Sequence, residues 1–127
     1  DMIDVGQTFL WLRERGVKIL GYHTDYCTGY VFESMHEKLD GMFETVAFQD
    51  KGKKLLLNPI PIEKRIHDNG ILEKAVKEAV EAVKKGEYFH PTVNGALDRL
   101  TNGRTSEIQL ESIVENAKLA GYIAEFK

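Results

Sequence analysis

The sequence is poor in cysteine: Cys27 is the only one among 127 residues. A single cysteine cannot close an internal disulfide, and few cysteines are typical of proteins from a reducing compartment. The sequence also lacks an apolar run long enough to span a membrane, and no charged-then-apolar signal segment opens it. We therefore expect a cytoplasmic protein without a membrane partner. The first residue is Asp1 rather than methionine, which predicts that the beginning of a longer chain has been removed.

Blocks of like charge are absent as well. Seventeen basic and twenty acidic residues give a formal net charge of −3, and the two signs are interspersed along the chain. A nucleic-acid surface needs clustered lysine and arginine, so we expect no nucleic-acid partner. With 43% hydrophobic residues, a chain of this length can bury the core of one modest domain.

The first forty per cent of the chain gives two clear elements and one ambiguous stretch. Apolar residues from Ile3 to Leu12 recur with helical spacing, and Gly16 is placed to end that helix. Val17–Leu20 then predicts a buried strand, and a helix followed so closely by a strand favours a parallel sheet. Residues 23–52 follow no single period. We expect mostly loop there, and the pattern leaves open a helix from Met42 to Phe48.

A second strand is predicted over Lys54–Asn58. Pro59 and Pro61 follow it, and because proline lacks an N–H group, the backbone must leave the sheet at this point. The end of a strand in an α/β protein is a common place for a ligand, which makes Asn58 a candidate binding residue.

The remainder of the sequence predicts three helices. The first follows Asn69 and stops at Gly86, the second starts at Pro91 and ends near Asn102, and the third starts at Ser106. Ser106 with Gln109 forms a capping-box pattern. The residues expected on the buried face of the last helix are Leu110, Ile113, Val114, Ala117, Ala120 and Ala124.

The residues that could carry chemistry are few. The four histidines are too widely spaced for a zinc site, and we expect each to be a surface or a hydrogen-bonded histidine. Cys27 lacks a local nucleophile pattern and fits a buried thiol. The turn Asn102–Thr105 brings an arginine and hydroxyl groups to a helix start, where N–H groups favour an anion. The alternative interpretation is that Thr105 or Ser106 simply caps the start of the helix.

Three ordered motifs resemble the carboxy-terminal portion of the pseudouridine-5′-phosphate glycosidases, also described as pseudouridylate synthase or indigoidine synthase A-like proteins. The first is Gly16-Val17 followed by Gly21-Tyr22-His-Thr24. The second is Asn58-Pro-Ile-Pro61, and the third joins Thr101-Asn-Gly-Arg-Thr105 to Asn116-Ala-Lys-Leu-Ala120. The resemblance covers nearly all of this sequence but well under half of a full family member.

The resemblance implies a partial three-layer α/β/α domain, with helices packed on a mostly parallel sheet. Residues 1–127 would form the carboxy-terminal part of a single α/β glycosidase domain, in an enzyme that is a homotrimer. The implied reaction is reversible cleavage of the C–C glycosidic bond to give uracil and ribose 5-phosphate. A lysine forms a Schiff base with the opened sugar, a glutamate donates a proton, and manganese binds near the phosphate.

None of these three groups is expected within this chain. Asp1-Met-Ile-Asp4 aligns with a family stretch that directly follows the lysine, so the nucleophile would precede Asp1, and the upstream half of the enzyme would be a partner of this segment. The resemblance implies that Gln109 stands where the family has an active-site asparagine. Together with Asn58, the turn residues Asn102, Arg104 and Thr105 would contact the sugar phosphate or nucleotide.

Two departures from the family pattern keep other functions open. Gln109 is one methylene longer than asparagine, and Thr24–Tyr30 lacks a proline that the family carries there. The alternatives are a divergent, non-catalytic structural or regulatory relative and a sugar-phosphate-binding domain.

Overall fold

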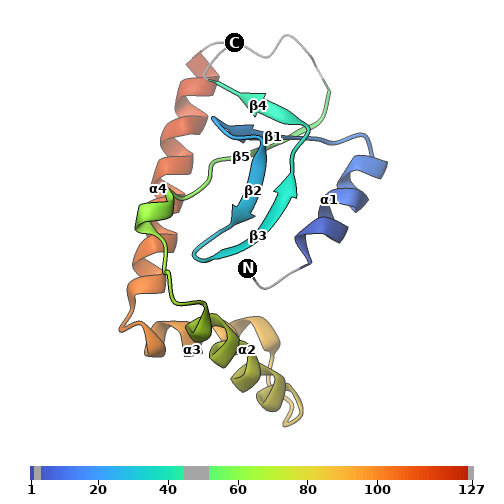
Figure 1. Ribbon diagram of the computed structural model, residues 1–127. Coiled ribbons are helices and arrows are strands. Elements are labelled where there is room, and N and C mark those ends of the chain that lie inside the picture. The colour runs from blue at the N-terminus through green and yellow to red at the C-terminus, as the bar shows by residue number, and fades with distance from the viewer. Residues whose placement is uncertain (2–3, 45–51, 126–127) are drawn as a thin grey trace.

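The computed structural model describes residues 1, 4–44 and 52–125, and it places a small sheet between two helices (Figure 1). The helices and strands, in chain order, are α1 (Val5–Glu14), β1 (Lys18–Tyr22), β2 (Tyr26–Gly29), β3 (Glu33–Lys38), β4 (Gly41–Phe43), β5 (Lys54–Leu57), the 3₁₀ helix η1 (Ile62–Lys64), α2 (Asn69–Val83), α3 (Phe89–Leu100) and α4 (Arg104–Glu125).

The central sheet has the order β4-β1-β5, and both of its pairings are parallel. Leu20 in the middle strand lies opposite Gly41 of β4 and Leu56 of β5. The predicted strands at 17–20 and 54–58 and the predicted parallel sheet are therefore confirmed. The helix expected before β1 is also present, and Gly16 follows it with a left-handed φ of 76°.

Alternation along β1 explains why helices cover both faces of this sheet. Ile19 points to one face, where it packs with Phe9 of α1 and Leu39. Leu20 points to the other face, where it packs with Phe43 and Leu119 of α4. Successive side chains of a strand point to opposite faces, so the apolar run of β1 serves two cores. The result is the predicted α/β/α layering.

The stretch from 23 to 52 differs from the expected loop. β2 and β3 form an antiparallel pair, with Tyr26 opposite Lys38 and Gly29 opposite Glu33, and β4 joins the central sheet. The open alternative of a helix from Met42 is wrong for its first two residues, because Met42 and Phe43 belong to β4. Residues 45–48 of that alternative lie outside the described residues.

The helices α2 and α3 form a hairpin below the sheet (Figure 1), with its own core. Phe32 and Ile60 reach into this core from the β2–β3 turn and from the segment after β5. Arg65 joins the same two segments. Its guanidinium, in a side chain only 5% exposed, donates to the carbonyl of Ile60 at 2.9 Å and to that of Phe32 at 3.4 Å. Burial lowers the pKa of Arg65, and the nearby Glu33 opposes this effect.

The long helix α4 buries a different face from the expected one. It starts at Arg104, not at Ser106, and its buried residues are Thr105, Ile108, Ser112 and Leu119. All six residues expected on the buried face are exposed, and Leu110 and Ile113 are 63% and 62% exposed. The helix has a second apolar stripe, and the described residues leave that stripe uncovered.

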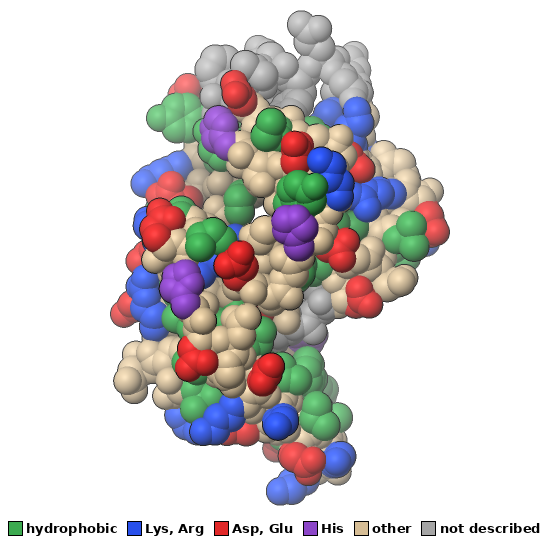
Figure 2. Space-filling view, in the orientation of Figure 1, with side chains coloured by type: hydrophobic (Ala, Val, Ile, Leu, Met, Phe, Trp, Pro, Cys, Tyr) green, Lys and Arg blue, Asp and Glu red, His purple; other side chains and the backbone are tan. Residues whose placement is uncertain are grey.

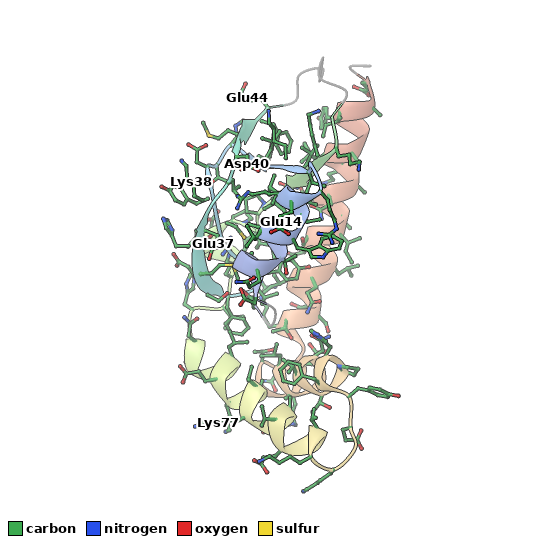
Figure 3. The ribbon with its side chains drawn as sticks, turned by 90° about the vertical axis from the view of Figure 1, so that its right-hand side faces the viewer. Glu14, Glu37, Lys38, Asp40, Glu44 and Lys77 are labelled. Carbon is green, nitrogen blue, oxygen red and sulfur yellow. The ribbon has the colours of Figure 1, made fainter. Side chains whose placement is uncertain are left out.

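Charged side chains of both signs are interspersed over the face in Figure 2. In the view of Figure 3, Glu37, Lys38, Asp40 and Glu44 follow β3, its turn and β4, whereas Lys77 lies on α2 at the other end of the molecule. Asp40 accepts hydrogen bonds from Arg13 and from the backbone N–H of Ile19, which ties α1 to β1. Asp40 therefore has a structural role. Within the described residues, no helix is long and apolar enough to cross a membrane.

Candidate ligand-binding site

Two cavities lie side by side where β5 ends, and they share Asn58, Pro59 and Ser112 in their walls. The larger has a volume of about 400 Å³ and is also lined by Tyr22, Lys64 and α4. The smaller, of about 200 Å³, is lined by residues of β2 and the turn after it, and by Asn116. Together they form the candidate site.

The local sequence explains why Asn58 faces these cavities. β5 ends at Leu57, and the prolines at 59 and 61 remove two N–H groups that would be needed to extend the sheet. Tyr22 ends the neighbouring strand β1, and because the strands are parallel, their carboxyl ends meet at the same edge. Ligands of α/β proteins bind at this edge.

The opposite wall comes from α4. Ser112 and Asn116 are four residues apart, so they lie one above the other on the same side of the helix. Glu115 and Lys118 line the larger cavity and form an ion pair with each other at 3.0 Å. The helix thus brings a hydroxyl, an amide, an ion pair and the further carboxylate of Glu111 to the site.

Several polar groups of the walls are available to a ligand. Within residues 1, 4–44 and 52–125, no hydrogen bond joins the side chain of Asn58, Ser112 or Asn116 to another group of the protein. Ser112 is only 8% exposed. Asn58 is half-buried and Ser112 is buried, and polar groups in such positions normally have partners, so these two favour a polar ligand. Asn116 is exposed and adds an amide at the margin of the smaller cavity.

The smaller cavity also lies beside the first residue. The carboxylate of Asp1 accepts hydrogen bonds from the backbone N–H groups of Tyr30 and Val31, at 2.9 and 2.8 Å. Cys27, Gly29 and Tyr30 all line the smaller cavity, so Asp1 lies at its margin.

Of the residues predicted from the sequence, Asn58 is part of the walls of both cavities. Gln109 is half-buried on α4 and is absent from both walls, although its neighbour Ile108 lines the larger cavity. Asn102, Arg104 and Thr105 lie together at the junction of α3 and α4, and they are absent from both walls as well. The structure therefore separates Asn58 from the other four.

An acidic side chain occupies the start of α4. Asp98 accepts hydrogen bonds from the Thr105 hydroxyl at 2.7 Å, from the Ser106 backbone N–H at 3.1 Å and from the Ser106 hydroxyl. The hydrogen bonds from Ser106 and Thr105 lower the pKa of Asp98. The expected capping box of Ser106 with Gln109 does not form, because Asp98 caps this helix.

Arg104 at the same junction pairs with two acidic residues of its own helix. Its guanidinium lies 3.1 Å from the carboxylate of Glu107 and 3.8 Å from that of Glu111. The positive charge and the helix start are thus both matched by carboxylates of the protein.

The sequence gives little indication of the site residues that only the structure identifies. Ser112 and Asn116 interrupt the apolar residues of α4 at helical spacing, which is the one signal that could have found them. Asp98 and Asp1 gave none, because their partners are chosen by the fold. Among the described residues, no three His, Cys, Asp or Glu side chains converge on a point that could hold a metal ion.

Comparison with known proteins shows which family the chain resembles. A family model described as "Indigoidine synthase A like protein" matches residues 1–126. A pseudouridine-5′-phosphate glycosidase from Kosmotoga olearia is 31% identical over 97% of this chain, and one from Thermotoga petrophila is 32% identical over the same share. The matches cover 47% and 46% of those relatives. The chain thus spans about half of their length.

A solved structure has the same fold. It is the prealnumycin C-glycosynthase AlnA in complex with ribulose 5-phosphate, and it superposes with a TM-score of 0.74 at 22% sequence identity. The superposition covers 98% of this chain and 46% of the AlnA chain. The AlnA comparison supports the α/β layering described above.

Proposed function

The chain belongs to the indigoidine synthase A-like protein family, and on that premise we propose that it is the carboxy-terminal part of a pseudouridine-5′-phosphate glycosidase. The enzyme would reversibly cleave the C–C bond between uracil and ribose 5-phosphate. We propose that residues 1–127 complete a single domain that starts upstream. The observation that carries the proposal is the pair of cavities at Asn58, lined by unpaired polar groups at the carboxyl edge of a parallel sheet.

In this proposal the chain binds and orients the substrate. The amide of Asn58 and the hydroxyl of Ser112 reach both cavities, and Asn116 reaches the smaller one. Such groups can hold the hydroxyls of an opened sugar and the edge of a pyrimidine. The apolar part of the wall, which includes Pro59, excludes water from the bond that breaks.

The reacting groups would come from outside this chain. We propose that a lysine immediately upstream of Asp1 forms the Schiff base, and that a glutamate of the upstream half protonates the leaving uracil. A divalent metal, manganese in this proposal, would neutralise phosphate charge. The described residues do not fit a metal site, so we assign the metal ligands to the upstream half. We also propose a cytoplasmic homotrimer.

The first test uses the full-length protein with pseudouridine 5′-phosphate and manganese. We expect uracil and ribose 5-phosphate as products, and we expect Asn58→Ala to lower kcat/KM by about 10- to 100-fold, because it leaves a substrate hydroxyl without its partner. Asn94→Ala removes an exposed amide on α3 and serves as the control. Products are measured by chromatography. Absence of uracil with the unaltered enzyme would contradict the proposed substrate.

A non-catalytic relative remains the second candidate, because Gln109 is absent from the walls of both cavities. Such a protein would still bind ribose 5-phosphate but would not form an adduct with it. Borohydride reduces a Schiff base to a stable amine, so the mass of the protein after reduction with ribose 5-phosphate separates the two functions. The residue that precedes Asp1 in the parent gene gives an independent answer, since only lysine fits the Schiff-base mechanism.

A further inference from the structure

The turn between β2 and β3 binds the side chain of Asp1 through successive backbone groups. The carboxylate accepts from the N–H of Tyr30 at 2.9 Å, of Val31 at 2.8 Å and of Phe32 at 3.1 Å, and it accepts from the hydroxyl of Ser34 as well. Figure 1 shows the N-terminus beside this turn. Consecutive N–H groups that point inward form a concave anion site, and hydrogen bonds to a charged acceptor are stronger than neutral ones.

The backbone at Gly29 makes room for this contact. Its φ is +128°, a conformation that favours glycine. A Cβ atom added at Gly29 would lie 2.9 Å from the Asp1 carboxylate and 2.2 Å from the Phe32 carbonyl. The turn therefore has a shape that admits Asp1 only while residue 29 lacks a side chain.

The location of Asp1 connects the turn to the candidate site. Gly29 and Tyr30, which surround the carboxylate, line the smaller cavity with Cys27 and Asn58. Asp1 is half-buried, and its backbone nitrogen lies near the Cys27 side chain. In a longer chain this nitrogen is a peptide nitrogen, so the preceding residue joins Asp1 at the margin of the smaller cavity.

We propose that Asp1 is a positioning residue, which is held by the β2–β3 turn and thereby places the residue before it at the cavity that Asn58 lines. The inference rests on the proposed function, which assigns the Schiff-base lysine to that preceding position. A lysine side chain is long and flexible, so its reach depends on where its backbone is fixed. Because Asp1 is held by the turn, the backbone of the residue before it is held as well, and Asp1 itself does not contact the substrate.

An alanine in place of Asp1 would remove all four hydrogen bonds and leave the N–H groups of the turn without their anion. Asparagine would keep one acceptor oxygen of similar position, so it should retain part of the anchoring. The carboxylate of Asp68, which accepts from the N–H of Gly70 at 3.0 Å at the start of α2, offers a matched control, because it caps backbone groups and is absent from the walls of both cavities.

The experiment compares the full-length protein with its Asp1→Ala, Asp1→Asn and Asp68→Ala variants. A misplaced reacting group can cost a factor of roughly 100 in rate. We expect Asp1→Ala to lower kcat by about 10- to 100-fold with KM changed less than about threefold, and to slow borohydride trapping of ribose 5-phosphate by a similar factor. The loss in Asp1→Asn should be smaller, and Asp68→Ala should keep both rates.

Two further measurements do not need activity. The first is the alkylation rate of the peptide that contains Cys27, measured by mass spectrometry, and the second is hydrogen exchange of the Val31 and Phe32 amides. We expect both to rise several-fold in Asp1→Ala and to stay unchanged in Asp68→Ala, because release of Asp1 opens the margin of the cavity.

The outcomes separate this inference from the proposed function. If the unaltered protein traps ribose 5-phosphate and Asp1→Ala traps it equally fast, the positioning role is refuted while the function stands. If the unaltered protein traps nothing, the proposed function fails, and the alkylation and exchange rates still decide whether Asp1 holds this segment. Equal alkylation and exchange in Asp1→Ala and Asp68→Ala would overturn the inference in either case.

Discussion

At the scale of single residues, Arg65 connects the β2–β3 turn to the segment that follows β5. It is a cation at 5% exposure whose recorded hydrogen bonds go to two backbone carbonyls rather than to a carboxylate. These carbonyls belong to Ile60, after β5, and to Phe32, in the turn that binds Asp1. Arginine has five N–H donors in a fixed plane, which lets one side chain satisfy both segments, whereas lysine has a single nitrogen.

We predict that Arg65→Lys lowers the free energy of unfolding by about 1 to 3 kcal/mol, because at least one buried carbonyl loses its partner. The exposed neighbour Glu63 provides the control, and Glu63→Ala should change stability by less than about 0.5 kcal/mol. Urea unfolding followed by circular dichroism measures both. An Arg65→Lys variant as stable as the unaltered protein would show that the carbonyls find other partners.

A site residue could be predicted only where its neighbours in the sequence mark its place in the fold. Asn58 could be predicted because two prolines mark the end of a strand within four residues. Asp98 could not, because a carboxylate near the end of one helix gives no sign that it will cap the next. Asp1 binds a turn that is almost thirty residues away in the sequence, and only the fold brings the two together.

At the scale of elements, α4 carries apolar residues on two sides. The stripe that contains Leu110, Ile113 and Val114 has better helical periodicity, so the sequence favoured it as the buried face. In the structure the sheet and α3 take the side of Ile108 and Leu119, which mixes apolar residues with Thr105 and Ser112. Periodicity identifies apolar faces, but it does not say which of two faces meets a given neighbour.

This burial pattern predicts that alanine substitutions of two isoleucines of α4 lower the stability by different amounts. We expect Ile108→Ala to lower the free energy of unfolding of the 127-residue chain by about 2 to 5 kcal/mol, because Ile108 is 1% exposed in the helical core. Ile113→Ala, at 62% exposure, should cost less than about 1 kcal/mol at protein concentrations low enough to keep the chain monomeric. Chemical denaturation of both variants gives the comparison. Equal costs would mean that Ile113 is covered in solution.

The strands β2 to β4 were missed for a related reason. β3 has the sequence Glu-Ser-Met-His-Glu-Lys, and all of its residues are exposed or half-buried, so it lacks the apolar alternation of a strand that packs on a core. Its pairing with β2 depends on backbone hydrogen bonds and on contacts such as the stacking of Tyr26 on His36, with ring centres 4.1 Å apart. Such cross-strand contacts cannot be read from one segment alone.

At the scale of the whole molecule, the surface is incomplete in two places. Within the described residues, β4 and β5 form the two edges of the central sheet and have no strand beyond them. The exposed stripe of α4 adds a row of large apolar residues. Edge strands of a sheet and contiguous apolar surface favour association with other protein segments.

We therefore predict that the 127-residue chain alone is weakly stable and associates with itself. Its melting temperature should rise with protein concentration, and co-expression with the upstream half of the enzyme should raise it further, because burial in an assembly stabilises the folded state. Sedimentation and calorimetry at several concentrations measure this. A sharp melt of a monomer, independent of concentration, would contradict the prediction.

The parallel pairing of β1 with β5 also determines the order in which the molecule can fold. The helices α2 and α3 adjoin along the chain and can meet through local contacts. In contrast, Ile19 can reach Leu55 only after residues 20–54 have closed into a loop that contains three other strands. Local contacts form quickly and distant pairings slowly. We therefore expect the edge of the sheet that carries Asn58 to assemble late, after the helical hairpin has formed.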